Sequence, residues 1–288
     1  MKVLVTGHRG LVGDAVVRVL AQARVDWIGL DLLEGDDVLD VELVCARATG
    51  CDAIVHLAAV EEDDEFDPVV PTTVTRVSHD HVLATNIEGS RNVLAAARLH
   101  GCRVIYLSSV DVLGCFLGQG QPAYYPIDDQ HPTHPIGAYA QSKLEGENLC
   151  DQFTRDTGVA TVCLRPPGVF DESTYEYITD ARASNPEFEW SPIWEYGAFI
   201  DVRDLADAVY RALTADLTGH HRLLVCAPDI SSSHDDSMTL ARRLTPDVPI
   251  RNPRLYTSQP FAALVDSTPA QELLGWSPRH RWRLGRAT

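Results

Sequence analysis

Short runs of β-branched and aliphatic residues alternate along this 288-residue chain with longer segments of helical period. This alternation is typical of a parallel sheet whose strands are joined by crossover helices. The runs that we expect to form strands are residues 2–6, 26–31, 52–58, 103–109, 160–166 and 222–227. We expect helices at "LVGDAVVRVLAQA", "NIEGSRNVLAAARLHG" and "AYAQSKLEGENLCDQFTRDTG", the last two ending at the C-capping Gly101 and Gly158. The sequence therefore predicts an α/β fold built on a doubly wound parallel sheet.

The regular alternation fades after about residue 167, where prolines cluster and the aromatic-rich segment 187–199 appears. We expect a main domain of residues 1–166, to which residues 199–228 return. Residues 167–198 and 229–288 are then a small, partly discontinuous lobe. Residues 61–80 carry a charge run and two prolines, which predicts a surface loop.

The composition excludes several classes of partner. A formal net charge of −17 argues against binding to nucleic acid or to an anionic membrane. The seven cysteines are an odd number and form no CxxC pair, so we expect a reduced, cytoplasmic protein with no disulfide framework and no metal site. We expect no signal peptide and no membrane-spanning segment, because no apolar run reaches the necessary length, and we expect a small-molecule ligand.

The N-terminal stretch "VLVTGHRGLVG" places three glycines, Gly7, Gly10 and Gly13, between the first strand and the first helix. Glycines at this spacing allow a tight turn and a close approach of the backbone to a pyrophosphate, which the free N–H groups of a helix N-terminus bind. Asp31 closes the second strand 24 residues after Gly7, where a carboxylate accepts hydrogen bonds from ribose hydroxyls. These features predict a Rossmann-type dinucleotide-binding domain that prefers NAD. Arg9 lies in the same turn, where it would contact the 2′-phosphate of NADP, so NADP is the alternative cofactor.

The stretch "YAQSK" sets Tyr139 and Lys143 one turn apart on one helical face, in a chain with only two lysines. A neighbouring ammonium stabilises a phenolate, which makes a tyrosine a better base near neutral pH. Ser108 and Ser109 end the fourth predicted strand, at the sheet edge where ligands bind. The alternatives are a surface lysine beside a half-buried tyrosine, and two serines that form a turn.

The chain resembles the extended short-chain dehydrogenase/reductases, the NAD-dependent epimerase/dehydratase family, over nearly its whole length. The matching segments occur in family order: "TGHRGLVG", Asp31, "HLAA", "NIEGSRNVLAAA", "LSSVDVLG", "YAQSK", "LRPPGVF", "FIDVRDLADAV" and "LLGWSPR". The resemblance implies that Ser109, five residues before Gly114, forms the catalytic set with Tyr139 and Lys143. It also implies a homodimer through the helices that start near Asn86 and Tyr139.

The expected cofactor-binding residues combine the glycine motif with positions that the resemblance implies. Asp40 and Val41 are expected near the adenine, Leu57 to Ala59 along the cofactor, and Pro166 and Pro167 against the nicotinamide. The full set is Gly7, Arg9, Gly10, Leu11, Val12, Gly13, Asp31, Asp40, Val41, Leu57, Ala58, Ala59, Asn86, Leu107, Tyr139, Lys143 and Pro166.

Two departures from the family pattern bear on the substrate. Nucleotide-sugar enzymes of the family commonly carry an asparagine where this chain has Gly168. The segment from Gly168 to Phe199 holds one basic residue, Arg182, so no diphosphate clamp is evident there, although Arg242, Arg243, Arg251 and Arg254 lie in the tail. The compact C-terminal part resembles members that act on small substrates, such as uronate dehydrogenases.

A third departure is Asp111, which matches one of two adjacent acids in the sugar dehydratases, while its neighbour is Val110. Dehydration needs both a base and an acid, so one carboxylate favours simple hydride transfer over dehydration. Asp111 is equally consistent with a solvated loop acid. The expected substrate residues are Ser109, Asp111, Tyr124, Gly168, Trp190 and Trp194. For Trp190 and Trp194, with Tyr175, Tyr177 and Tyr196 nearby, the alternative is the core of the small lobe.

These observations lead to one main hypothesis and two alternatives. The main hypothesis is an NAD-dependent oxidoreductase that transfers hydride at a secondary alcohol or ketone of a carbohydrate-like small molecule. The first alternative is a nucleotide-sugar epimerase or dehydratase, or a tailoring enzyme of secondary metabolism. The second is a non-catalytic NAD(P) sensor, which the retained Tyr139 and Lys143 disfavour.

Overall fold

The computed structural model describes residues 1–61, 78–116, 118, 120–189 and 195–283 of the chain. Trp190, Trp194 and most of the predicted loop at 61–80 lie outside the described residues. The chain divides into two compact units. Unit 1 comprises Met1–Ser108, Pro135–Cys163 and Leu217–His221, and unit 2 comprises Ser109–His134, Leu164–Asp216 and Arg222–Thr288.

A six-stranded sheet has the order β2-β1-β3-β4-β5-β8, and its pairs β1–β2, β1–β3 and β3–β4 are parallel. The strands are β1 (Lys2–Thr6), β2 (Asp26–Leu30), β3 (Ala53–His56), β4 (Arg103–Leu107), β5 (Thr161–Arg165) and β8 (His220–Leu224). Each overlaps a strand predicted from the sequence. The sheet grows from β1 toward β2 on one side and toward β3 on the other, which creates the switch point where ligands bind in doubly wound folds. The predicted Rossmann-type fold is confirmed.

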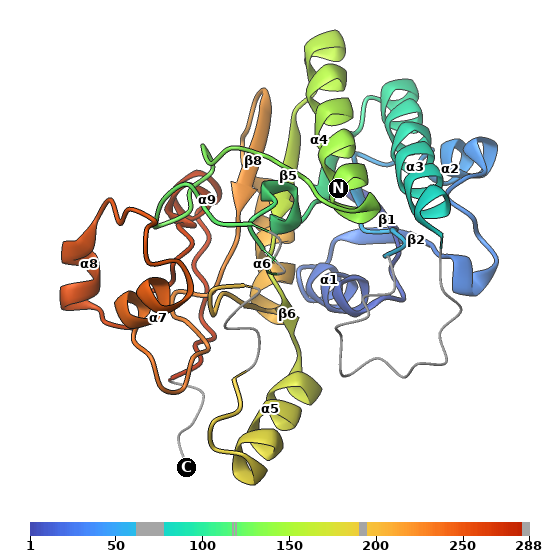
Figure 1. Ribbon diagram of the computed structural model, residues 1–288. Helices are drawn as coiled ribbons and strands as arrows, with labels where there is room; N and C mark the ends of the chain where they lie inside the picture. Colours follow the sequence, from blue (N-terminus) through green and yellow to red (C-terminus); the bar gives the residue numbers. More distant parts are fainter. Residues whose placement is uncertain (62–77, 117, 119, 190–194, 284–288) are drawn as a thin grey trace. The chain divides into compact units, whose positions relative to one another are not determined.

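Unit 1 carries the crossover helices α1 (Leu11–Gln22), α2 (Val41–Arg47), α3 (His79–His100) and α4 (Ala138–Thr157), with the 3₁₀ turn η1 (Leu32–Glu34). Helices α3 and α4 pack side by side, and α2 packs against α3 (Figure 1). Helix α3 begins seven residues before the predicted start at Asn86. Gly101 and Gly158 end α3 and α4 with φ of 71° and 73°, as predicted. A buried apolar cluster that includes Leu4, Ile54, Val93 and Phe153 fills this unit.

Unit 2 contains the 3₁₀ turn η2 (Val110–Leu113) and a two-stranded parallel pair, β6 (Val169–Phe170) and β7 (Ile200–Asp201). Its helices are α5 (Glu172–Ser184), α6 (Val202–Thr214), α7 (Ser237–Leu244), α8 (Pro253–Ser258) and α9 (Thr268–Leu274). An apolar cluster of Phe170, Ile178, Phe199, Ala227 and Trp282 is buried in this unit. Among the described helices of both units, none is long and apolar enough to cross a membrane.

Candidate active site

The glycine turn between β1 and α1 is shaped by two close approaches of the backbone. Gly7 has φ of +71°, and a Cβ atom there would lie 2.7 Å from the backbone N of Ala58. A Cβ atom on Gly13 would lie 2.2 Å from the carbonyl oxygen of Gly7. No other residue fits either position. Gly10 is the N-cap of the 12-residue helix α1, whose first-turn N–H groups have no acceptor within the helix.

The segment after β3 completes this part of the site. The N–H groups of Leu57 and Ala58 donate to the backbone oxygen and to Oγ1 of Thr6, at 3.2 and 3.3 Å. These bonds hold Leu57 and Ala58 against the glycine turn, at the switch point of the sheet. A backbone cradle that excludes side chains and ends in a helix N-terminus fits the pyrophosphate of a dinucleotide.

Asp31 joins the end of β2 to the glycine turn. Its carboxylate accepts from the N–H of Arg9 at 2.8 Å and from the N–H of Leu33 at 2.9 Å. Each carboxylate oxygen has a second acceptor position for a ribose hydroxyl. Asp31 therefore both supports the turn and presents negative charge where a ribose would bind.

Arg9 is engaged by a carboxylate. Its guanidinium pairs with Glu34 at 3.3 Å, and Glu34 also contacts Nε2 of His8 at 3.3 Å. A 2′-phosphate at this position would meet the charges of Asp31 and Glu34 together with that of Arg9. The arrangement fits NAD better than NADP.

A chain of buried hydrogen bonds connects the end of β1 to the fourth helix. His56 contacts Thr6 Oγ1 through Nδ1 at 2.7 Å and Ser90 Oγ through Nε2 at 3.3 Å. Burial, and secondarily the Lys143 ammonium, lower the pKa of His56 to about 3, so the imidazole is neutral.

The chain continues through Asn86, whose carbonyl oxygen accepts from Ser90. The Asn86 side-chain amide donates to Val60 O at 2.8 Å and to Ser142 Oγ at 2.9 Å, and Ser142 donates to the carbonyl of Tyr139 at 2.7 Å. Asn86 was predicted to bind cofactor. Its side chain ties the segment after β3 to the first turn of α4.

Helix α4 presents Tyr139 and Lys143 to the carboxyl end of β4. Lys143 is 3% exposed, its Nζ donates to Leu107 O at 2.8 Å, and Nζ lies 5.2 Å from the centre of the Tyr139 ring. One turn further on, the buried carboxylate of Glu147 accepts from Ser108 Oγ at 2.6 Å. Two consecutive residues at the end of β4 are thus held by one face of α4. This explains why Ser108 points into the fold and leaves Ser109 as the candidate hydroxyl.

In unit 2, Ser109 is the N-cap of η2. Its hydroxyl donates to Asp111 Oδ2 at 2.8 Å and accepts from the N–H of Asp111 at 3.2 Å. The N–H of Val110 donates to Pro166 O at 3.1 Å, which joins this turn to the segment after β5. Asp111, predicted as a substrate residue, thus directly orients the Ser109 hydroxyl.

Three further predicted residues lie away from the glycine turn in the sequence. Asp40 caps α2 by accepting from the N–H of Leu43 at 3.0 Å, and Val41 is exposed on the first turn of that helix. Tyr124 is buried, donates to Asp128 at 2.7 Å and is covered by the guanidinium of Arg251.

Of the aromatic set near the small lobe, Tyr196 is a core residue and Tyr175 is partly buried against the core of unit 2. Tyr196 is 2% exposed and donates to the carbonyl of Cys115 at 2.6 Å. Tyr175 packs against the rings of Phe199 and Trp282. Tyr177 lies at the surface, with 37% of its area exposed.

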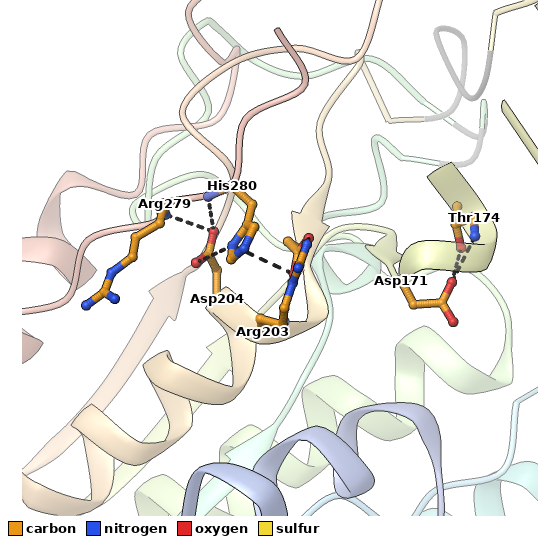
Figure 2. Close-up of polar contacts among 7 residues, drawn as sticks. Asp171, Thr174, Arg203, Asp204, Arg279 and His280 are labelled. Atoms are coloured by element: carbon orange, nitrogen blue, oxygen red, sulfur yellow. Dashed lines mark hydrogen bonds and ion pairs between the residues drawn. The ribbon is translucent and has the colours of Figure 1, made fainter. Parts of the chain in front are cut away.

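A carboxylate that the sequence did not single out joins two of the motifs. Asp204, in "FIDVRDLADAV", is 3% exposed and accepts from the N–H groups of Arg279 and His280 at 2.9 and 2.8 Å (Figure 2). The indole of Trp276, in "LLGWSPR", donates to the Asp204 carbonyl at 3.0 Å. The two motifs therefore hold the C-terminal tail in place together, which their separate positions in the sequence do not reveal.

Comparison of the sequence with known proteins assigns the chain to a family. The sequence profile of the NAD dependent epimerase/dehydratase family matches residues 3–226. A UDP-glucose 4-epimerase of Corynebacterium glutamicum is 25% identical over 325 residues, covering 97% of this chain and 92% of that protein. A GDP-6-deoxy-D-mannose reductase of Pseudomonas aeruginosa is 33% identical over 236 residues, covering 74% of this chain and 70% of that protein.

Solved structures share the fold. The crystal structure of a uronate dehydrogenase from Agrobacterium tumefaciens superposes with a TM-score of 0.63 at 20% identity, covering 99% of this chain and 86% of that chain. The chain belongs to the NAD dependent epimerase/dehydratase family and is an NAD(P)-dependent enzyme of the short-chain dehydrogenase/reductase type.

Proposed function

We propose that the protein is an NAD-dependent oxidoreductase that acts on a secondary alcohol or ketone of a carbohydrate-like small molecule, with Ser109, Tyr139 and Lys143 as its catalytic residues. The observation that carries the proposal is the buried Lys143, whose Nζ is fixed by Leu107 O at 2.8 Å and lies 5.2 Å from the Tyr139 ring. Burying an ammonium group costs free energy. Its place beside a tyrosine therefore supports a chemical role, which is to stabilise the phenolate form of Tyr139.

Tyr139 and Lys143 have separate roles in the proposed reaction. Tyr139 exchanges the proton of the substrate hydroxyl, and the charge of Lys143 stabilises its phenolate form. NAD, when bound, supplies the carbon that accepts or returns the hydride. The chain of bonds from Thr6 through Asn86 to the Tyr139 carbonyl supports the first turn of α4, so that Tyr139 keeps its orientation.

Ser109 is proposed to hold the substrate oxygen. Its hydroxyl proton is directed to Asp111. Because the one proton of a substrate alcohol goes to Tyr139, Ser109 holds the substrate oxygen as a hydrogen-bond donor, which requires its hydroxyl to rotate away from Asp111. Asp111 is therefore a positioning residue that competes with the substrate oxygen for this proton.

A purified-protein assay tests the proposal. The protein is incubated with NAD and a panel of hexoses, amino sugars, hexuronates and UDP-sugars, and NADH formation is followed by absorbance while epimeric products are followed by NMR. We expect net NADH formation, lost by about 10²–10⁴-fold in Tyr139→Phe with NAD affinity retained. The epimerase relative covers 97% of this chain, so epimer formation without net NADH would replace the proposal by the epimerase alternative. Equal turnover in Tyr139→Phe would refute the catalytic set.

We further propose a homodimer through α3 and α4. The two helices pack together, and on α3 the small residues Ala84 and Ala95 face solvent within one chain, which permits close approach of a second copy. Light scattering should give twice the chain mass for the wild type, and Ala84→Glu with Ala95→Glu should give the monomer. A monomeric wild type contradicts this proposal.

A further inference from the structure

The ammonium group of Lys143 lies near the ring of Tyr106 as well as that of Tyr139. Its Nζ is 5.4 Å from the centre of the Tyr106 ring and 5.2 Å from the centre of the Tyr139 ring. Both distances are within the range in which an aromatic ring attracts a cation. Tyr106 belongs to β4 and comes one residue before Leu107, whose carbonyl oxygen accepts from Nζ at 2.8 Å. The end of β4 therefore meets the Lys143 head with both a ring and a carbonyl group.

Helix α4 contains a glycine where the Tyr106 side chain reaches the helix. A Cβ atom on Gly146 would lie 2.2 Å from Tyr106 Oη and 2.4 Å from Tyr106 Cζ. Gly146 is buried inside the helix, and its φ is not in the left-handed region that favours glycine. Glycine inside a helix is less favourable than alanine. The missing side chain therefore serves the close approach of the Tyr106 ring to α4, three residues after Lys143.

Two sheet residues near the Lys143 head are neutral rings. Tyr106 is 3% exposed, and burial raises the pKa of its hydroxyl well above the usual range, so it is a neutral phenol. The neutral His56 is its register partner on β3, and the two ring centres are 5.6 Å apart. On α4, the buried carboxylate of Glu147 binds Ser108 one turn beyond Lys143. A neutral aromatic ring beside a buried ammonium reduces the cost of its burial.

We infer that Tyr106 is a positioning residue for the proposed reaction, and that its ring holds the Lys143 ammonium beside Tyr139. The inference rests on the proposed function, in which the charge of Lys143 stabilises the phenolate form of Tyr139. That stabilisation depends on the distance between the two charges. The lysine side chain is a flexible four-carbon stem, and contact with the Tyr106 ring limits the positions that its head can take. Tyr106 thus acts through Lys143, whereas Tyr139 exchanges a proton with the substrate.

The mobility of the Lys143 head can be measured directly. The chain has two lysines, Lys2 and Lys143, so NMR of protein labelled with ¹³C at the lysine ε carbon gives two signals. The Lys143 signal is identified by its loss in Lys143→Met. Its order parameter is measured in the NAD-loaded protein without substrate for the wild type, Tyr106→Leu, Gly146→Ala and Phe153→Leu. Phe153 is a buried ring on α4 in the same apolar cluster as Tyr106, so its variant is the matched control for loss of a ring.

In the wild type the order parameter of the Lys143 ε carbon should be above about 0.6, and it should fall below this value in Tyr106→Leu. Gly146→Ala should lower it too, because the added methyl group displaces the Tyr106 ring. Phe153→Leu should leave it unchanged. Tyr106→Leu combined with Gly146→Ala is a second variant that lacks the ring. Alanine fills part of the vacated space there and favours the helix, which keeps this variant folded.

A double-mutant cycle on kcat tests whether Tyr106 acts through Lys143. With the alcohol substrate identified by the panel assay, Tyr106→Leu should lower kcat by about 3–30-fold, the range expected for loss of a cation–π contact. In the Lys143→Met background the same substitution should change kcat by less than about twofold, because the charge that the ring positions is absent. A purely structural role of Tyr106 would lower kcat by the same factor in both backgrounds.

Three results would overturn the inference: an unchanged Lys143 order parameter in Tyr106→Leu, equal changes in Tyr106→Leu and Phe153→Leu, or equal losses of kcat in the two backgrounds of the cycle. The first two results need no turnover. Full turnover in Tyr139→Phe would refute the proposed reaction, while the order parameters would still decide whether Tyr106 holds Lys143 in place.

Discussion

Replacing Lys143 by methionine removes one buried charge and keeps most of the side-chain volume. Nζ lies 5.2 Å from the Tyr139 ring, and Lys143 is 3% exposed. At an effective dielectric constant of about 20, two unit charges at this separation interact by about 3 kcal/mol. If this energy is available to the tyrosinate in the transition state, its loss lowers kcat by about 200-fold.

The assay compares kcat over a range of pH, NAD affinity by calorimetry and thermal unfolding for the wild type, Lys143→Met and Lys143→Arg. In Lys143→Met the acidic limb of the profile for alcohol oxidation should move to higher pH, because the phenolate loses its stabilising charge. Lys143→Arg keeps the charge on a planar group that fits the Leu107 carbonyl differently, so its kcat should fall between the other two. The reasoning is refuted if folded Lys143→Met stays within about fivefold of wild-type kcat with an unchanged pH profile.

Three further predictions follow from individual carboxylates. Asp31→Asn combined with Glu34→Gln removes two negative charges beside Arg9. The ratio of the dissociation constants for NADP and NAD, measured by calorimetric titration, should therefore fall by about tenfold. A wild type that binds NADP more tightly than NAD would contradict this prediction. Asp204→Ala leaves the N–H groups of Arg279 and His280 without their acceptor. The free energy of unfolding should therefore fall by about 2–3 kcal/mol in urea titrations, and limited proteolysis should cut the C-terminal tail. An uncut tail would show that these hydrogen bonds are not needed to hold it. Burial raises the pKa of Asp129 from 3.8 to about 6. The folded state therefore binds the carboxyl proton of Asp129 more tightly than the unfolded state does. The free energy of unfolding should fall by about 3 kcal/mol as pH rises from about 4 to about 6. Asp129→Asn should lack that fall, and parallel curves for the two proteins would rule out the assignment.

Much of the fold was predictable because its signals are local. Each predicted strand overlaps an observed one, and the glycines at 101 and 158 end their helices with positive φ as expected. Helix α6 was not predicted, although Asp201 caps it and Leu205, Val209 and Ala212 supply a buried face at helical spacing. That signal was present in the sequence. Helix α5 offered much less, because Ile178 is its one buried residue and its other side chains give no apolar stripe.

The candidate site was predictable where function depends on spacing along the chain. Tyr139 and Lys143 share a helical face because they are four residues apart, and the glycine turn follows from its strand–turn–helix context. The pairing of Arg9 with Glu34 was not predictable in this way, since it depends on how the turn after β2 folds back. The contact of Asp204 with the tail spans 75 residues and has no local signature.

Gly168 shows how a departure from a motif acquires a different meaning in three dimensions. In the sequence, the glycine is only the loss of an asparagine side chain that the nucleotide-sugar enzymes commonly have at this position. In the structure, the space beside it is filled by the carboxylate of Glu195, 27 residues further along the chain. The replacement therefore exchanges a neutral amide, which can donate and accept, for a charged group that can only accept.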